Sequence, residues 1–308
     1  MIKKLSIAGL VLALIGFAGF WFLTQPNEMS TRQLAAFPAG DALAGETMFW
    51  AGGCASCHAD KSAKDDAKLV LSGGVDLKTP FGTFYAPNIS PDSTHGIGNW
   101  SLAQFANAMK RGVSPKGEHY YPAFPYTSYA RMSDKDVADL FAYMKTLPAN
   151  KTPSKSHDVG FPFNVRRGLG LWKKLYLDPS FVIEVEAGNQ QLERGRYLVE
   201  GPAHCGACHT PRNPIGGPDK SRWLAGGPAV EGTGFIPNLT PHKSGLGNWS
   251  SSEIADSMKT GFTPEFDSFG SSMADVQLNM AKLTDADRAA IAAYLKVLPA
   301  IEKQAKNN

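Results

Sequence analysis

The sequence predicts an all-α protein in which two similar domains stand in tandem behind an N-terminal apolar helix. Three observations predict this architecture. The 308-residue chain begins with a long apolar run, a set of short motifs occurs twice at a spacing of about 150 residues, and the segments around these motifs carry helix caps and helical apolar spacing. The chain therefore holds two copies of one helical unit.

The N-terminal segment has the length of a membrane span. Lys3 and Lys4 precede Leu5–Leu23, a run of 19 residues with one serine and no charge. A span needs roughly 17–25 such residues, whereas the apolar part of a signal peptide has about 7–15 and ends at small side chains. Because this run ends in bulky residues, it favours an uncleaved anchor over a cleaved signal peptide. The two lysines are then expected on the cytoplasmic side and the rest of the chain outside.

The internal repeat consists of five pairs of segments. The pentapeptide Cys54–His58 (CASCH) returns as Cys205–His209 (CGACH), a shift of 151 positions. The other pairs follow in the same order at shifts of 149 to 151: APNIS at 86 and IPNLT at 236, GIGNWS at 96 and GLGNWS at 245, MKRG at 109 and MKTG at 258, and the stretch from Ser133 to Pro148 against that from Thr284 to Pro299. We therefore predict an anchor over residues 1–30, a first domain over 31–150, a connector over 151–187 and a second domain over 188–308.

Each domain is predicted to contain three main helices, and strand patterns are weak throughout. The second helix begins at a serine followed three residues later by glutamine or glutamate, which is a capping box. The third has acidic residues in its first turn, where they suit the helix dipole. The predicted ranges are Asp41 to Gly52 and Gln190 to Glu200 for the first helix, Ser101 or Ser250 onward for the second, and Ser133 to Pro148 or Thr284 to Pro299 for the third.

The repeated pentapeptide indicates covalent attachment of haem. Two thiols three positions apart can form thioether bonds to the two vinyl groups of one haem, and the histidine that follows can bind the iron. All four cysteines of the chain lie in these motifs. We therefore predict two haem c groups, one on Cys54, Cys57 and His58 and the other on Cys205, Cys208 and His209.

Three other uses of such cysteine pairs are weaker. A thioredoxin-like redox pair belongs to a βαβ context that the sequence does not show. Structural zinc takes two pairs at short separation, but 148 positions separate Cys57 from Cys205. Ordinary disulfides need no histidine after each pair. Haem attachment also fits an oxidising space, so we expect an inner-membrane protein of bacteria with both domains in the periplasm.

A methionine is the expected second axial ligand in the first domain, because methionine opposite histidine raises the potential of an electron carrier. Met132 is the only methionine between the middle and last helices of this domain. His119 is its main rival. Met109 and Met144 fall inside predicted helices, where core packing is the better interpretation.

In the second domain the expected methionine ligand is Met273, which lies 64 residues past His209. Met280 stands closer to the last helix and is interpreted as a core residue. Leu283 occupies the position that corresponds to Met132, so the two loops differ.

Several polar residues have two interpretations each. Asn88 and Asn238 either donate to haem propionates or stabilise their own turns. Arg212 either pairs with a propionate or is solvated at the surface. Basic and apolar residues alternate from Val165 to Leu177, which predicts a connector helix that lies either on a membrane or partner, or between the two domains.

With these pieces in place, the sequence resembles the cytochrome c subunits of membrane-bound periplasmic dehydrogenases, which serve alcohols, gluconate, sorbitol and fructose. The matching segments are YLVEG at 197, HCGACHTPRN at 204, YPAFPY at 121 and MSD at 132. The resemblance covers nearly everything after the anchor. It implies two tandem class I cytochrome c-like domains, His58 and His209 as proximal ligands and methionines as distal ligands. Those subunits usually carry three haem domains, whereas this chain has two.

The function that follows is electron transfer, with no catalytic residue in the chain itself. The resemblance implies transfer from the catalytic subunit of a periplasmic dehydrogenase to a respiratory acceptor, either quinone or a terminal oxidase. A net charge of +3 gives no reason to expect nucleic-acid binding. The alternative is a dihaem cytochrome c peroxidase, which also has two such motifs but needs one iron open to peroxide. A dihaem thiosulfate-oxidising enzyme would need a further cysteine ligand, and none is left over.

Overall fold

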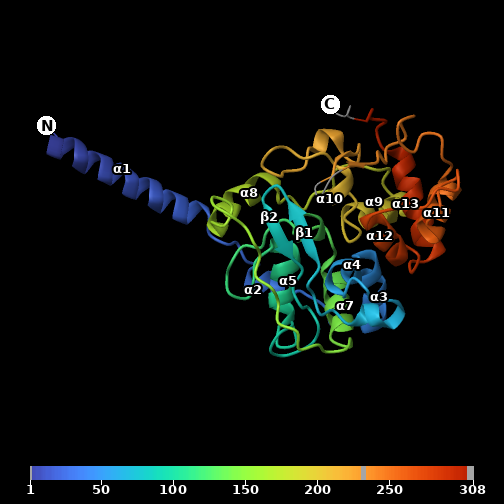
Figure 1. Ribbon diagram of the computed structural model, residues 1–308, viewed down its shortest axis with the longest axis horizontal. Coiled ribbons are helices and arrows are strands. Elements are labelled where there is room, and N and C mark those ends of the chain that lie inside the picture. Colours follow the sequence, from blue (N-terminus) through green and yellow to red (C-terminus); the bar gives the residue numbers. More distant parts are fainter. Residues whose placement is uncertain (1, 230–233, 304–308) are drawn as a thin grey trace.

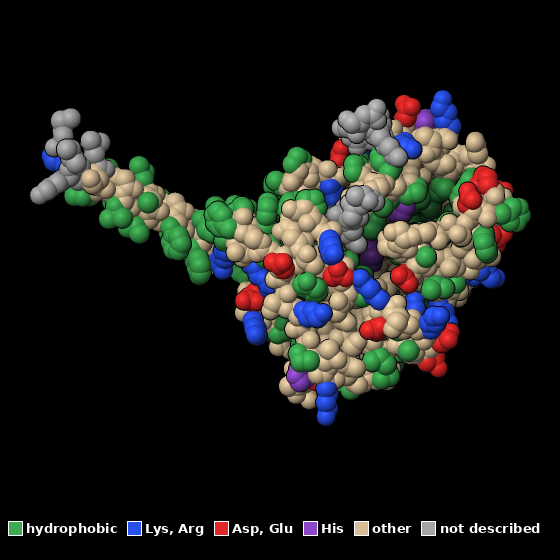
Figure 2. All heavy atoms as spheres, viewed as in Figure 1, with side chains coloured by type: hydrophobic (Ala, Val, Ile, Leu, Met, Phe, Trp, Pro, Cys, Tyr) green, Lys and Arg blue, Asp and Glu red, His purple; other side chains and the backbone are tan. Residues whose placement is uncertain are grey.

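The computed structural model describes residues 2–229 and 234–303. Helix α1 (Ile2–Leu23) projects away from the rest of the molecule (Figure 1). Its stretch Ser6–Leu23 has a mean hydropathy of 2.2 and no part of it is buried, and it is the one described helix long and apolar enough to cross a membrane. Hydrophobic side chains cover this helix, whereas charged side chains are spread over the folded part (Figure 2).

The three main helices predicted for the first half are present, and shorter helices that were not predicted accompany them. Together they are α2 (Thr31–Ala35), α3 (Ala42–Ala51), α4 (Cys54–His58), α5 (Leu102–Arg111), α6 (Tyr126–Tyr129) and α7 (Asp134–Met144), with a 3₁₀ turn at Asp65–Leu69. Asp41 caps α3 by accepting from the Leu43 N–H at 2.9 Å. The predicted capping box of α5 is present, since Ser101 and Gln104 accept from each other's backbone N–H groups.

The second half repeats this order. Its helices are α9 (Gln190–Glu200), α10 (Gly206–His209), α11 (Ser251–Thr260), α12 (Ser272–Met280) and α13 (Asp285–Val297), with a 3₁₀ turn at Lys220–Arg222. Helix α11 has the predicted capping box, formed by Ser250 and Glu253. Thr284 caps α13 through the Asp287 N–H at 3.0 Å. The helical plan predicted from the repeat is therefore confirmed in both halves.

Each half is built around two crossing helices, α3 with α7 and α9 with α13, and glycine makes both crossings close. A Cβ atom on Gly45 would lie 2.0 Å from the carbonyl oxygen of Asp139, and one on Gly195 would lie 2.0 Å from that of Ala290. Any side chain larger than hydrogen would push these helices apart. The repeat thus extends from sequence to packing.

Buried apolar side chains fill the space beside each crossing. In the first half Phe49 of α3 and Leu140 of α7 are at most 1% exposed, and in the second half Leu198 of α9 and Ile291 of α13 are at most 2% exposed. These residues belong to one continuous buried apolar cluster that runs through both halves. The two halves therefore share one hydrophobic core and are not structurally independent domains.

Two short antiparallel hairpins were not predicted. Strand β1 (Asp76–Thr79) pairs with β2 (Gly82–Tyr85), with Asp76 opposite Tyr85, and β3 (Gly227–Pro228) pairs with β4 (Phe235–Ile236). None of the described strands exceeds four residues, which is too short for an alternating pattern to stand out in the sequence. The fold remains mainly helical, as expected.

The connector packs between the anchor and both halves (Figure 1). It forms a 3₁₀ turn at Arg166–Gly168 and then helix α8 (Leu169–Tyr176). Lys173 donates to two carbonyl oxygens at the end of α5, at 2.7 and 2.6 Å, and Trp172 donates to a carbonyl of the second half at 3.0 Å. Arg167 stacks on Trp21 of α1 at 4.0 Å. These contacts support the interpretation of a linking helix that packs between the domains.

The close helix crossings predict a local stability effect. Gly45→Ala and Gly195→Ala should each lower the free energy of unfolding by about 1–3 kcal/mol, because the new methyl group overpacks the crossing. Denaturant unfolding followed by circular dichroism measures this change. Gly168→Ala is the matched control, since a Cβ there meets no atom within 4 Å. If Gly45→Ala and Gly195→Ala were as stable as the control, the helices could move apart without a loss in the free energy of unfolding, and the prediction would be wrong.

Candidate functional site

Both pentapeptides form a helical turn that ends on a histidine, α4 in the first half and α10 in the second. Nδ1 of His58 lies 2.7 Å from the carbonyl oxygen of Pro87, and Nδ1 of His209 lies 2.8 Å from that of Pro237. Because a carbonyl oxygen only accepts, Nδ1–H is the donor in both rings and Nε2 keeps its lone pair. A metal-ligating imidazole is typically held by such a second hydrogen bond.

Burial keeps both imidazoles neutral. It lowers the pKa of His58 and of His209 from the ordinary value, and the hydrogen bond to the prolyl carbonyl offsets part of this shift. A neutral ring with an unprotonated Nε2 is the form that binds iron. The donor set in each turn, two sulfur atoms and one imidazole nitrogen, therefore fits attachment of haem c.

The cysteines do not have the environment of a redox pair. Burial raises the pKa of the Cys54 and Cys205 thiols to about 12, whereas a thioredoxin-like pair needs a thiol with a lowered pKa. Within residues 2–229 and 234–303, no group of three or more cysteine, histidine, aspartate or glutamate side chains is placed to hold a metal ion directly. Haem attachment remains the interpretation that suits these positions.

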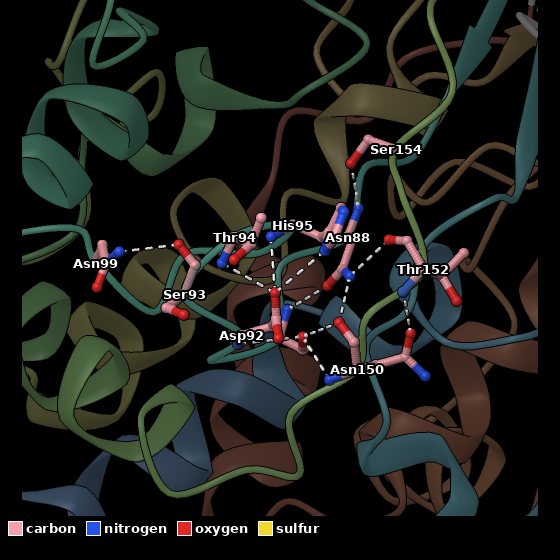
Figure 3. A network of polar contacts seen from close by, with 10 residues as sticks. Asn88, Asp92, Ser93, Thr94, His95, Asn99, Asn150, Thr152 and Ser154 are labelled. Atoms are coloured by element: carbon pink, nitrogen blue, oxygen red, sulfur yellow. Dashed lines mark hydrogen bonds and ion pairs between the residues drawn. The ribbon is translucent and has the colours of Figure 1, made fainter.

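The loop that supplies the Pro87 carbonyl is held by the next residue, Asn88 (Figure 3). The Asn88 side-chain amide donates to the carbonyl oxygens of Asn150 and Thr152, both at 2.8 Å, and its Oδ1 accepts from the Ser90 N–H at 2.9 Å. Further along this loop, Asp92 accepts from two backbone N–H groups and closes the next turn. The loop is therefore fixed against the chain that follows α7.

Asn238 repeats this arrangement in the second half. Its side-chain amide donates to the carbonyl oxygen of Ile301 at 2.7 Å, and its Oδ1 accepts from the Thr240 N–H at 2.8 Å. Both asparagines thus stabilise their turn, which was one of the two interpretations. They also do more, because each joins the loop beside its histidine to the segment after the last helix of its half. These long-range partners could not be predicted from the sequence.

Met132 is positioned by its backbone. It lies between α6 and α7 and is 2% exposed. Its N–H donates to the carbonyl oxygen of Tyr129 at 3.0 Å, and its carbonyl oxygen accepts from Lys110 at 2.8 Å. The side chain belongs to the buried apolar cluster against which Cys54 packs. This surrounding suits a methionine that faces a buried cofactor.

The second half holds its methionines differently. Leu283 takes the structural place of Met132, since it also follows the preceding helix by three residues and its N–H donates to the carbonyl oxygen of Met280 at 3.2 Å. Met280 is 4% exposed in the apolar cluster, whereas Met273, near the start of α12, is partly exposed. The core interpretation of Met280 agrees with this burial, and Met273 stays the expected ligand.

Two other candidate side chains have structural partners. Nε2 of His119 lies 2.9 Å from the carbonyl oxygen of Thr24, just past the anchor helix. Arg212 is half-buried, and it donates to the carbonyl oxygen of Ala207, within the second pentapeptide, at 2.8 Å and to that of Gly216 at 2.6 Å. Arg212 thus braces the backbone of the second motif, a role that the sequence analysis did not predict.

The two motifs also contact each other across the halves, which the sequence could not show. Nε2 of His204, the residue before Cys205, lies 3.2 Å from the carbonyl oxygen of Gly52. The Asn279 side chain of α12 donates to Ser56 Oγ at 2.6 Å. Helix α12 lies beside α4 and α3 (Figure 1). The second half is therefore packed directly on the first pentapeptide.

Comparison with known proteins agrees with these features. The family described as cytochrome c matches residues 42–148 and 192–299, one match in each half. A diheme cytochrome c-type protein of Cereibacter sphaeroides is 56% identical over 97% of this chain and 100% of its own length.

Two further relatives are named as subunits of dehydrogenases. The fructose dehydrogenase cytochrome subunit of Gluconobacter japonicus is 38% identical over 83% of this chain and 52% of its own length. The gluconate 2-dehydrogenase cytochrome c subunit of Pantoea cypripedii is 35% identical over 96% of this chain and 65% of its own length. The chain thus spans about half to two thirds of these two subunits. The resemblance found in its motifs is confirmed, and the chain belongs to the cytochrome c family, with one cytochrome c domain in each half.

Proposed function

We propose that the chain is a dihaem cytochrome c that carries electrons from the catalytic subunit of a periplasmic dehydrogenase to a respiratory acceptor. The observation that carries this proposal is the equivalent hydrogen bond from histidine to a prolyl carbonyl at the end of both pentapeptide turns. The proposed attachment and ligand residues are Cys54, Cys57, His58 and Met132 for one haem c, and Cys205, Cys208, His209 and Met273 for the other.

The residues of the chain hold and tune the group, while bound haem c supplies an iron that takes up and releases one electron. The paired cysteines fix the porphyrin to α4 and α10. The Pro87 and Pro237 carbonyls orient the imidazoles and increase their basicity. The thioethers of Met132 and Met273 would raise the potential of the bound group, and the apolar cluster would restrict the access of water to it.

The relatives support the choice of partner. Two of them are named as cytochrome subunits of dehydrogenases, which supports a catalytic subunit as the electron donor of this chain. The peroxidase alternative finds no support among these relatives. We propose quinone or a terminal oxidase as the acceptor, because an anchored carrier beside the membrane can reach either one.

The anchor is the other part of the proposal. We place α1 in the bacterial inner membrane and both halves in the periplasm. The exposed apolar surface of α1 supports this placement, as does its attachment to the folded part. Arg167 stacks on Trp21 and donates to its carbonyl oxygen at 2.6 Å, which suits an aromatic and a cation at the interface.

Haem content and substrate-driven reduction test the proposed function. The full-length protein should contain two haem c groups per chain by pyridine haemochrome assay, and both should become reduced in membranes when the dehydrogenase substrate is added. His58→Ala and His209→Ala should each remove one low-spin signal in electron paramagnetic resonance, because each takes the proximal nitrogen from one iron. His242→Ala is a matched control outside the pentapeptides. An unchanged spectrum in either ligand variant would refute that ligand.

The distal ligands have their own test. Met132→Ala and Met273→Ala should each lower one of two midpoint potentials and weaken the far-red band that a sulfur-to-iron bond produces, because each loses a thioether ligand. Redox titration with optical detection measures both effects. Met280→Leu, at a buried position of similar volume, should leave the potentials unchanged. A shift in Met280→Leu with none in Met273→Ala would exchange the roles of these two residues.

Removal of the anchor should separate membrane attachment from haem binding. A chain that starts at Thr24 behind a cleavable export signal should be recovered from the periplasm as a soluble protein with two haems. Fractionation and haem staining measure the result. If the truncated chain stayed in the membrane fraction, attachment would reside in the connector or in a bound partner.

A further inference from the structure

One carbonyl oxygen joins the two haem motifs. Nε2–H of His204, the residue before Cys205, donates to the carbonyl oxygen of Gly52 at 3.2 Å, and Gly52 stands two residues before Cys54. The Tyr129 hydroxyl donates to the same oxygen at 3.2 Å. The rings of Tyr129 and His204 meet edge to face with their centroids 5.6 Å apart. The imidazole is therefore fixed in a partly buried junction between the halves.

His204 departs from the repeat at a position that suits glycine. It corresponds to Gly53 of the first half, and both residues have the left-handed backbone conformation, with φ of +40° at His204 and +59° at Gly53. Residues with a Cβ atom rarely adopt this conformation, and strain of this kind persists where the surrounding structure holds it, often at functional sites. The second half thus keeps a strained histidine where the first half uses glycine. In exchange for this strain, the second half has a side chain that donates a hydrogen bond to the Gly52 carbonyl oxygen.

The contact between the halves does not depend on His204 alone. Asn279 donates to Ser56 Oγ at 2.6 Å, and Asp275 pairs with Lys68 at 3.4 Å. Both bonds enter the second half at α12, away from Cys205. The His204 bond joins the residue before the second pentapeptide to the segment before the first. The contacts of α12 hold the halves together without it.

We propose that His204 couples the two haems, because its hydrogen bond to Gly52 completes a bonded route for electrons between the two attachment motifs. The inference rests on the proposed dihaem function. The route runs from Cys54 through the backbone to the Gly52 carbonyl, across one hydrogen bond, and through His204 to Cys205. With both haems bound, one electron would leave one iron and reduce the other, no bond would break, and His204 would keep its proton. His204 acts as a positioning residue and is not an electron carrier itself.

His204→Gly is the sharpest test, because it gives the second half the residue that the first half already has and relieves the strained backbone. In the full-length protein with both haems, rapid photochemical reduction followed by optical recording measures electron exchange between them. We expect exchange to slow several-fold while haem content, low-spin spectra and the unfolding temperature stay as in the wild type. His204→Asn also tolerates the left-handed backbone but lacks the ring, and should slow exchange likewise.

Ser56→Ala is the matched control, since it removes the hydrogen bond from Asn279 of the second half to the first motif and leaves His204 in place. It should exchange electrons at the wild-type rate. Wild-type exchange in His204→Gly with two haems present would overturn the inference, and so would equal slowing in Ser56→Ala, because the cause would then be the packing of the halves. Fewer than two haems in the wild-type protein would refute the proposed function itself, and the haem assay detects this before any rate is measured.

Discussion

The hydrogen bond from an imidazole Nδ1–H to a prolyl carbonyl is the constraint on which each half depends. It fixes the tautomer of His58 and His209 and sets which ring nitrogen faces outward from the pentapeptide turn. The carbonyl must itself be held in place, and Asn88 and Asn238 do this by binding the chain beyond the last helix. The contact at each histidine therefore depends on a second contact between residues 62 positions apart in the first half and 63 in the second.

The helix crossings supply the frame in which that contact can recur. Gly45 and Gly195 bring the helix before each pentapeptide equally close to the backbone of the last helix of its half. Close backbone contact also limits the ways in which the two helices can pack, because one helix cannot slide along the other without opening a gap. The chain after the last helix then lies where the asparagine can reach it. Packing far from the site thus decides the geometry at the site.

Much of this could be predicted from sequence where the cause is local. Helix caps such as Ser101 and Thr284 act over three or four residues, and so do the paired thiols. Their effect can therefore be predicted from residues that are close in the sequence. The partners of Asn88 and Arg212 are backbone carbonyls, which carry no residue signature, and the hairpins are too short to show a period. The contact of His204 with Gly52 could not be predicted for another reason, because it depends on how one half packs on the other.

The halves differ most where they meet, and the differences have physical causes. In the first half Pro122 and Pro125 interrupt the segment before Met132, so that α6 is one short turn. The second half lacks prolines there, and α12 is nine residues long and lies against α4. The two segments fit different neighbours: in α6 Tyr126 contacts Trp172 of α8 and Tyr129 contacts His204, whereas α12 lies against α3 and α4, so the two segments cannot keep the same sequence. The longer helix and the histidine before Cys205 are then two parts of one adaptation, which turns a duplicated domain into a pair with a fixed junction.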